Sequence, residues 1–232
     1  MRSVLDDIDV RAIKTGMLFT TETVKAVTAS LRAHFDAHGR VPVVCDPVCV
    51  STSGHALLQP DAVNTIIEEL LPLSHVITPN QAEAELFLKE RALPCSITSL
   101  SDMLVAAQNL LTLGPDAVLL KGGHISVSED DVRHVLVPEG ATLDLRPAFL
   151  LGENMEVLYK NGKTARVTDV VVDVLCRRGV KTITLYSRPR LQSKNTHGTG
   201  CTLSAALACA LGSGMSGNGC HQRCLEVISH SL

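Results

Sequence analysis

The amino-acid sequence predicts an α/β protein, with three α/β/α layers around a mostly parallel central sheet. In the first half of the chain, short β-branched or apolar runs alternate with longer segments of helical periodicity. The short runs are apolar along their whole length, which is typical of strands that helices cover on both faces. The 232 residues, of which 45% are hydrophobic, are enough to bury one core, so we expect a single domain over residues 1–232.

The elements of the first half follow one another in βαβ order. Short apolar runs predict strands over 10–15, 41–46, 75–78 and 117–121. Helical periodicity predicts helices over 21–38, 60–71, 81–91 and 99–113. Strands that alternate with helices in this way form parallel sheets.

The pattern changes between residues 132 and 187, where several candidate strands follow one another. Glu139-Gly140 and Asn161-Gly162 are turn signals between them, and the sequence leaves the order of these strands open. The remaining predicted elements are an extra helix over 169–178, a strand over 181–186 and a final apolar helix over 202–211. The chain contains no internal repeat.

Charge and composition exclude several classes of partner. The net charge is −3, and only 3% of the residues are aromatic, so the chain lacks the basic stripe and the stacking side chains of a nucleic-acid surface. No apolar run is long enough to span a bilayer, and the residues after Met1 lack the features of a signal peptide. We therefore expect a cytoplasmic protein without a membrane partner, and we leave open a homodimer.

The eight cysteines indicate reduced core residues. Most of them lie inside apolar segments, at spacings that fit neither a disulfide framework nor a pair of CxxC zinc motifs. Cys220, His221 and Cys224 could form half of a metal site, but the sequence offers no second half. We therefore expect no structural zinc.

The most informative stretch of the chain, residues 194–207, places a glycine-rich loop before an apolar helix. Gly198 and Gly200 let the backbone turn tightly, and the first N–H groups of a helix lack intrahelical partners. Together with the helix dipole, these N–H groups favour a phosphate or a developing phosphoryl transition state. Two alternatives stay open: the loop is only a turn and cap, or Cys201 and His197 are the nucleophile and base of a cysteine hydrolase.

Polar residues also follow four of the predicted strands. They are Lys14-Thr15-Gly16-Met17, Asp46-Pro47-Val48, Thr78-Pro79-Asn80 with Glu83, and Lys121-Gly122-Gly123-His124. A turn or a helix cap explains each group alone, but the carboxyl ends of parallel strands share one sheet edge, where ligands bind. There, Asp46 and Glu83 offer oxygen ligands for Mg²⁺, directly or through water, and Lys121 can neutralise a phosphate. This combination indicates phosphoryl transfer.

Six motifs follow one another along the chain. They are Lys-Thr-Gly-Met-Leu, Asp-Pro-Val, Ser-Gly, Ile-Thr-Pro-Asn-x-x-Glu, Lys-Gly-Gly-His and Asn-Thr-His-Gly-Thr-Gly-Cys-Thr-Leu-Ser-Ala-Ala. Their order resembles the hydroxymethylpyrimidine/phosphomethylpyrimidine kinases of thiamine biosynthesis, in the ribokinase-like superfamily. The resemblance covers about residues 5–125 and 193–215, and the last motif is its most specific part. It implies ATP- and Mg²⁺-dependent phosphorylation of 4-amino-5-hydroxymethyl-2-methylpyrimidine and then of its monophosphate to the diphosphate.

The resemblance also implies roles for individual residues. Cys201 stands where the wider superfamily usually carries an aspartate base, so it would activate the substrate hydroxyl or phosphate. The other implied roles are an anion hole of Gly198, Thr199 and Gly200, phosphate contact by Lys121, and a pyrimidine pocket lined by Met17 and Val48. Asp46 and Glu83, together with Asn80, would organise Mg²⁺ and its water, and the cofactor contacts are those of Asn80, Thr196 and His197. A pyridoxal-type kinase is the alternative, and a cysteine in place of the aspartate favours the pyrimidine.

Departures from the family pattern predict an incomplete enzyme. Family members begin with a glycine-rich strand and a segment whose glutamine reads the pyrimidine, and the chain from Met1 onward contains neither. The connection at about 153–180 is longer than in the family, and the tail at about 216–232 is atypical. We therefore expect these residues to bind Mg²⁺-nucleotide weakly and the pyrimidine not at all, which makes an impaired fragment the second alternative.

Overall fold

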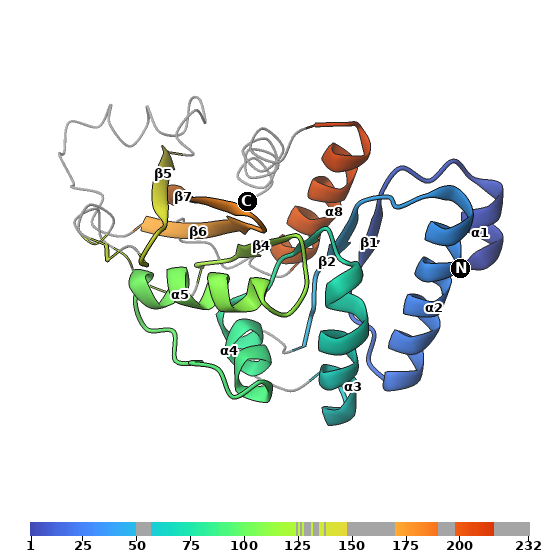
Figure 1. Cartoon of the computed structure of the whole chain (residues 1–232), viewed down its shortest axis with the longest axis horizontal. Helices are drawn as coiled ribbons and strands as arrows, with labels where there is room; N and C mark the ends of the chain where they lie inside the picture. Colours follow the sequence, from blue (N-terminus) through green and yellow to red (C-terminus); the bar gives the residue numbers. More distant parts are fainter. Residues whose placement is uncertain are drawn as a thin grey trace.

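A mixed sheet forms the centre of the molecule, with helices against both of its faces (Figure 1). The computed structural model describes residues 1–49, 57–123, 125, 127, 131, 135–136, 138–147, 170–189 and 198–215. Over these residues the sheet has seven strands in the order β1-β2-β3-β4-β6-β7-β5.

Most of the strand pairs are parallel, as predicted. The strands are β1 (Ile13–Thr15), β2 (Val43–Cys45), β3 (Val76–Ile77), β4 (Ala117–Leu120), β5 (Thr142–Pro147), β6 (Val170–Arg177) and β7 (Val180–Pro189). Strands β1 to β4 pair in parallel, and β5 is parallel to β7. Strand β6 lies between β4 and β7 and is antiparallel to both. The predicted mostly parallel sheet is therefore confirmed.

Most of the helices lie close to their predicted positions. They are α1 (Arg2–Asp7), α2 (Thr21–His38), α3 (Pro60–Thr65), α4 (Gln81–Glu90), α5 (Leu100–Leu111) and, near the end of the chain, α8 (Thr199–Gly212). Helix α3 continues into a π-helical turn, Ile66–Leu70, and a 3-10 turn, Leu71–Leu73, where Pro72 lacks the N–H for a regular ladder. Helix α1 has no predicted counterpart.

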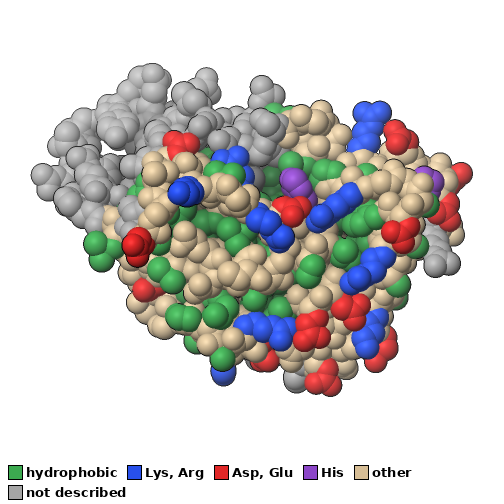
Figure 2. All heavy atoms as spheres, viewed as in Figure 1, with side chains coloured by type: hydrophobic (Ala, Val, Ile, Leu, Met, Phe, Trp, Pro, Cys, Tyr) green, Lys and Arg blue, Asp and Glu red, His purple; other side chains and the backbone are tan. Residues whose placement is uncertain are grey.

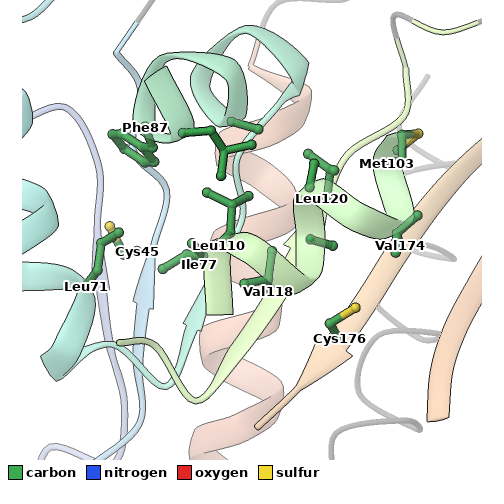
Figure 3. Packing of buried hydrophobic residues seen from close by; sticks show 14 of the residues in the cluster. Cys45, Leu71, Ile77, Phe87, Met103, Leu110, Val118, Leu120, Val174 and Cys176 are labelled. Atoms are coloured by element: carbon green, nitrogen blue, oxygen red, sulfur yellow. The ribbon is translucent and has the colours of Figure 1, made fainter. Parts of the chain in front are cut away.

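Two hydrophobic clusters, one on each face of the sheet, hold the layers together. Successive strand residues point to opposite faces, so Val118 and Leu120 of β4 pack on the α4 and α5 side, with Val174 and Cys176 of β6 (Figure 3). Leu119 points to the other face. The cluster on that face contains Val44, Val76, Leu119, Leu175 and Tyr186 of the sheet and Leu203 and Leu207 of α8. The predicted α/β/α layers are therefore confirmed.

The segment 169–178 forms a strand, and the predicted helix is wrong. Four of the first five residues of β6 are valines, whose β-branched side chains suit a strand, and residues 171–176 are buried on both faces. A strand buried on both faces is apolar nearly throughout, so periodicity does not distinguish it from a buried helix. Arg178 and Gly179 then form a two-residue turn into β7, with Gly179 at φ 72°.

The structure tests the cysteine prediction in part. All six cysteines among the described residues are free, and Cys45, Cys49 and Cys176 are buried, whereas Cys201 and Cys209 are exposed. Burial raises the pKa of the Cys45 and Cys176 thiols to about 12. These two behave as the expected reduced core residues.

The described residues include only part of the two segments that depart from the family pattern. The long connection at 153–180 is described from residue 170, where it forms β6 and the turn to β7, and the tail at 216–232 lies outside the described residues. Within the described part of the chain, no helix is long and apolar enough to cross a bilayer. On the face seen in Figure 2, basic and acidic side chains are interspersed.

Candidate active site

Three polar side chains follow β2, β3 and β4 on the face of the sheet that α8 covers. Asp46, Thr78 and Lys121 each stand two residues beyond a strand residue that clusters with α8, and alternate residues of an extended chain share a face. Asp46 is 2% exposed, and Thr78 is fully buried. The structure therefore brings together polar residues from three strand ends, at the edge where the sequence places them.

Asp46 is the centre of this group. Its Oδ1 atom lies 3.3 Å from the Lys121 ammonium nitrogen and accepts a 3.3 Å hydrogen bond from the Thr78 hydroxyl. Its Oδ2 atom accepts a 3.1 Å hydrogen bond from the hydroxyl of Ser204, which is fully buried on α8. Because a buried carboxylate is costly without such partners, these contacts fix β2, β3, β4 and α8 around one side chain.

The first turn of α8 lies against the Lys121 ammonium. Gly198 is the N-cap residue, at φ 82°, and its carbonyl accepts a 2.9 Å hydrogen bond from the N–H of Thr202. A Cβ atom on Gly200 would lie 3.0 Å from the Lys121 nitrogen, so the glycine lets the ammonium approach the backbone. A helix N-terminus beside a lysine suits an anion such as a phosphoryl group.

Cys201 lies in the same turn, close to Asp46. Partial desolvation raises the pKa of its thiol, and the charge of Asp46 acts in the same direction. The positive charges of Lys14 and Lys121 oppose this shift without reversing it. The Cys201 thiol therefore loses its proton less readily than an ordinary cysteine thiol.

Glu83 and Asn80 join the start of α4 to the loop after β2. The Asn80 side chain accepts a 3.0 Å hydrogen bond from the N–H of Glu83, and the N–H of Asn80 donates to Glu83 Oε2 at 2.8 Å, which makes a capping box. Glu83 Oε1 accepts a 3.2 Å hydrogen bond from the N–H of Cys49. Burial raises the pKa of the Glu83 carboxyl, although the charge of Lys121 acts to lower it.

The predicted Mg²⁺ ligands do not make a closed metal site by themselves. Among the described residues, no group of three or more His, Cys, Asp or Glu could hold a metal ion. Both oxygens of Glu83 accept backbone hydrogen bonds, and Asp46 is paired with Lys121. Because Mg²⁺ keeps several waters and binds substrate phosphates, this donor set fits contact through water better than direct coordination by both carboxylates.

The residues predicted to line a pyrimidine pocket lie on two neighbouring loops. Met17 follows β1 and is 53% exposed, and Val48 follows β2, which pairs with β1. Val48 has φ 42°, and Phe19, on the loop of Met17, has φ 56°. Positive φ is costly for a β-branched or bulky residue, and such strain clusters at functional sites. The contact of Met17 and Val48 with a substrate stays a prediction, and Phe19 is a candidate that no sequence pattern marks.

The structure describes some of the predicted site residues but not all of them, and it adds one residue that was not assigned a role. Two of the predicted nucleotide-binding residues, Thr196 and His197, lie outside the described residues. Ser204 contacts Asp46 at the site, and although it lies within the most specific sequence motif, no role is predicted for it. The one available signal is a hydroxyl one turn after Cys201 in an apolar helix, whereas its partner Asp46 lies 158 residues away in the sequence.

Comparison with protein families and with individual sequences gives consistent matches. The model of the phosphomethylpyrimidine kinase family matches residues 1–155 and 150–231. A hydroxymethylpyrimidine/phosphomethylpyrimidine kinase of Rhizobium meliloti is 37% identical over 215 residues, which are 93% of this chain and 61% of that protein. The Streptomyces coelicolor protein of the same name is 35% identical over 93% of this chain and 60% of its own length. The chain thus spans about 60% of the length of these two relatives.

Solved structures agree with these matches. The phosphomethylpyrimidine kinase of Clostridium difficile 630 superposes with a TM-score of 0.66 at 25% identity, over 99% of this chain and 72% of that chain. An ADP complex of Bacillus subtilis pyridoxal kinase superposes with a TM-score of 0.68 at 24% identity, over 97% of this chain and 65% of that chain. The second likeness shows the ribokinase-like fold alone. On the family match and the two sequence relatives together, the chain belongs to the phosphomethylpyrimidine kinase family.

Proposed function

We propose that this site serves the ATP-dependent phosphorylation of 4-amino-5-hydroxymethyl-2-methylpyrimidine, and then of its monophosphate, in thiamine biosynthesis. Membership of the family supports the reaction class. The observation that carries the proposal is the position of Lys121, between Asp46 and the first turn of α8. An ammonium and a helix N-terminus that meet at one point stabilise the charge of a phosphoryl group in transfer.

Each residue of the site has a part in this proposal. The backbone of Gly198, Thr199 and Gly200 surrounds the transferred group, and Lys121 neutralises its charge. Asp46 keeps the ammonium in place through the 3.3 Å contact. Cys201 contacts the acceptor hydroxyl, and it takes up the hydroxyl proton only after its own thiol proton has left to solvent, which the charges of Lys14 and Lys121 favour.

The nucleotide and the metal ion complete the proposed site. Asn80, Thr196 and His197 contact the nucleotide, and Asp46 and Glu83 hold waters of a Mg²⁺ ion that neutralises phosphate charge when bound. Their positions support this, because Asp46 and Glu83 lie close enough for the charge of one to shift the pKa of the other.

An assay of ADP release tests the proposed reaction. The protein is incubated with ATP, Mg²⁺ and one of three acceptors: the hydroxymethylpyrimidine, its monophosphate or pyridoxal. The proposed function predicts turnover with both pyrimidines and little with pyridoxal, whereas the impaired fragment predicts none. Turnover with pyridoxal alone would assign the site to the other kinase, and a folded protein without turnover on any acceptor would contradict the proposal.

Calorimetry separates the proposed function from the impaired fragment. Saturable binding of the pyrimidine by these 232 residues would support the proposed function and overturn the expectation that they do not bind it. Nucleotide binding without pyrimidine binding would support the fragment instead.

A further inference from the structure

Strand β6 carries a carboxylate that the proposed function does not use. Asp173 is 1% exposed and stands within a valine-rich strand. Val174 lies opposite Leu120 of the antiparallel neighbour β4, so Asp173 lies opposite Lys121, the residue that follows β4. It shares a strand face with Leu175, which clusters with α8, and this is the face of the site. A buried carboxylate is costly without hydrogen bonds, so its contacts indicate its role.

Asp173 holds the turn that follows Lys121. Its Oδ1 atom accepts a 2.9 Å hydrogen bond from the N–H of Gly122, whose carbonyl accepts a 3.0 Å hydrogen bond from the N–H of Ile125. A Cβ atom on Gly122 would lie 1.9 Å from the carbonyl oxygen of Val172, so the turn lies directly against the β6 backbone. Strand β6 therefore holds the N–H of Gly122 through the Asp173 side chain, and its backbone leaves no room for a side chain at Gly122.

The peptide groups on both sides of the Lys121 Cα atom are held in this way. The N–H of Lys121 donates to the carbonyl of Pro79 at 2.9 Å, and the next N–H along the chain donates to Asp173. From this fixed backbone, the Lys121 side chain reaches Asp46 and the first turn of α8. We propose that Asp173 is a positioning residue, which places the Lys121 ammonium where the phosphoryl group binds. The catalytic part of this inference rests on the proposed function, and the placement of Lys121 does not.

Hydrogen exchange in the unmodified protein is the first test. The N–H of Gly122 donates to a buried carboxylate, so it should exchange far more slowly than in an unstructured peptide. Exchange of the Gly122 N–H at the rate of an unstructured peptide would overturn the proposal. Because this test uses the unmodified protein, it does not depend on whether a variant folds.

Amine labelling of Lys121 is the second test, and it needs no enzymatic activity. Limited acylation followed by peptide mass spectrometry gives the rate at which Lys121 reacts. Asp173→Leu removes the acceptor, Asp173→Asn keeps an acceptor oxygen, and Thr184→Val changes a fully buried side chain of the neighbouring β7 as a control. We expect faster labelling of Lys121 in D173L, and rates close to the unmodified protein in D173N and T184V. Equal rates in D173L and the unmodified protein would overturn the proposal.

Kinetics distinguish positioning from a loss of stability. D173L should lower kcat on the order of 100-fold, as expected when a catalytic group is misplaced, whereas D173N and T184V should stay near the unmodified enzyme. In a Lys121→Ala background, D173L should have no further effect on kcat, because the group that Asp173 positions is gone. A full further loss in that background would overturn the proposal. Altered labelling in a protein that phosphorylates no acceptor would support the placement of Lys121 and contradict only the proposed function.

Discussion

Asp46 and Lys121 form a partly buried ion pair in the candidate site. The carboxylate is 2% exposed and the lysine side chain 17%, so their contact is shielded from water far more than a surface ion pair. Thr78 and Ser204 also contact Asp46, which keeps the carboxylate in place when the lysine turns toward a ligand. A cation that is held, but not closed off from solvent, can exchange its partner carboxylate for a phosphate.

Replacing Lys121 by methionine tests this pair. The substitution keeps most of the side-chain stem and removes the charge, so we expect kcat to fall by about 10²- to 10³-fold, as when a transition-state donor is lost. Asp46 loses its counter-charge but keeps two hydroxyl donors, so the free energy of unfolding should fall by only about 1–3 kcal/mol. ADP release and urea unfolding measure the two effects, with Lys25→Met on an exposed position of α2 as the control. An unchanged kcat would remove Lys121 from the site.

Gly122 and Gly123 form a matched pair for a second prediction. A Cβ atom on Gly122 would meet the Val172 carbonyl oxygen at 1.9 Å, whereas one on Gly123 has no neighbour within 4 Å. Gly122→Ala should therefore destabilise the fold by about 1–3 kcal/mol or more, through forced backbone shifts. Gly123→Ala should stay within about 0.5 kcal/mol of the unmodified protein. Urea unfolding of both variants checks this, and equal stability of the two would mean that β6 does not lie against the turn.

At the scale of elements, α4 and α5 both begin with a capping box, one at the candidate site and one away from it. Asn80 and Glu83 form a capping box at the site, and Ser99 and Asp102 form another at an exposed helix start. The comparison separates the stabilising role of a cap from a role in binding. Both caps satisfy the first N–H groups of a helix, so their contribution to stability should be similar.

Asn80→Ala and Ser99→Ala are the matched variants. Each should lower the free energy of unfolding by about 1 kcal/mol. Only Asn80→Ala should also raise the KM for ATP, because it removes the acceptor of the Glu83 N–H and so loosens Glu83 and the Cys49 loop that Glu83 holds. Urea unfolding and steady-state kinetics measure this, and a KM raised equally by both variants would contradict a specific role for Asn80.

The sequence predicts those elements best whose signals are local. Helix α2 has the predicted bounds, 21–38, because an amphipathic period and a Thr20 cap act over a few residues. For β6 the sequence predicts a helix, because the valine-rich run pairs as a strand only through β4 and β7, which other segments of the chain supply. For the same reason the sequence predicts no role for Asp173 and Ser204, since their hydrogen-bond partners lie 51 and 158 residues away in the sequence.

At the scale of the whole molecule, the apolar clusters on the two faces of the sheet differ in size and in their distance from the candidate site. The helices α2 to α5 cover a large apolar cluster on one face, whereas α8 covers a smaller cluster on the other face and carries the first turn of the site. A change in the larger cluster should therefore affect stability, and a change under α8 should also affect chemistry.

Leu104→Ala and Leu207→Ala test this difference. Both side chains are fully buried, one in α5 against the larger cluster and one in α8 against the smaller. Each should lower the free energy of unfolding by about 2–5 kcal/mol. At a temperature where both variants are folded, only Leu207→Ala should lower kcat, because it loosens the helix that carries Gly200 and Cys201. Equal kcat values in the two variants would contradict the link between α8 packing and the site.

In the proposed function, the first turn of α8, with Lys121 and Asp46, holds the phosphoryl group in transfer. A crystal structure with a non-hydrolysable ATP analogue, Mg²⁺ and the hydroxymethylpyrimidine tests it most directly. We predict that the terminal phosphate lies within hydrogen-bonding distance of the backbone at Gly200 and of the Lys121 ammonium, with the pyrimidine hydroxyl next to Cys201. A terminal phosphate bound elsewhere, with Lys121 still paired to Asp46 and no ligand at the α8 N-terminus, would contradict the claim.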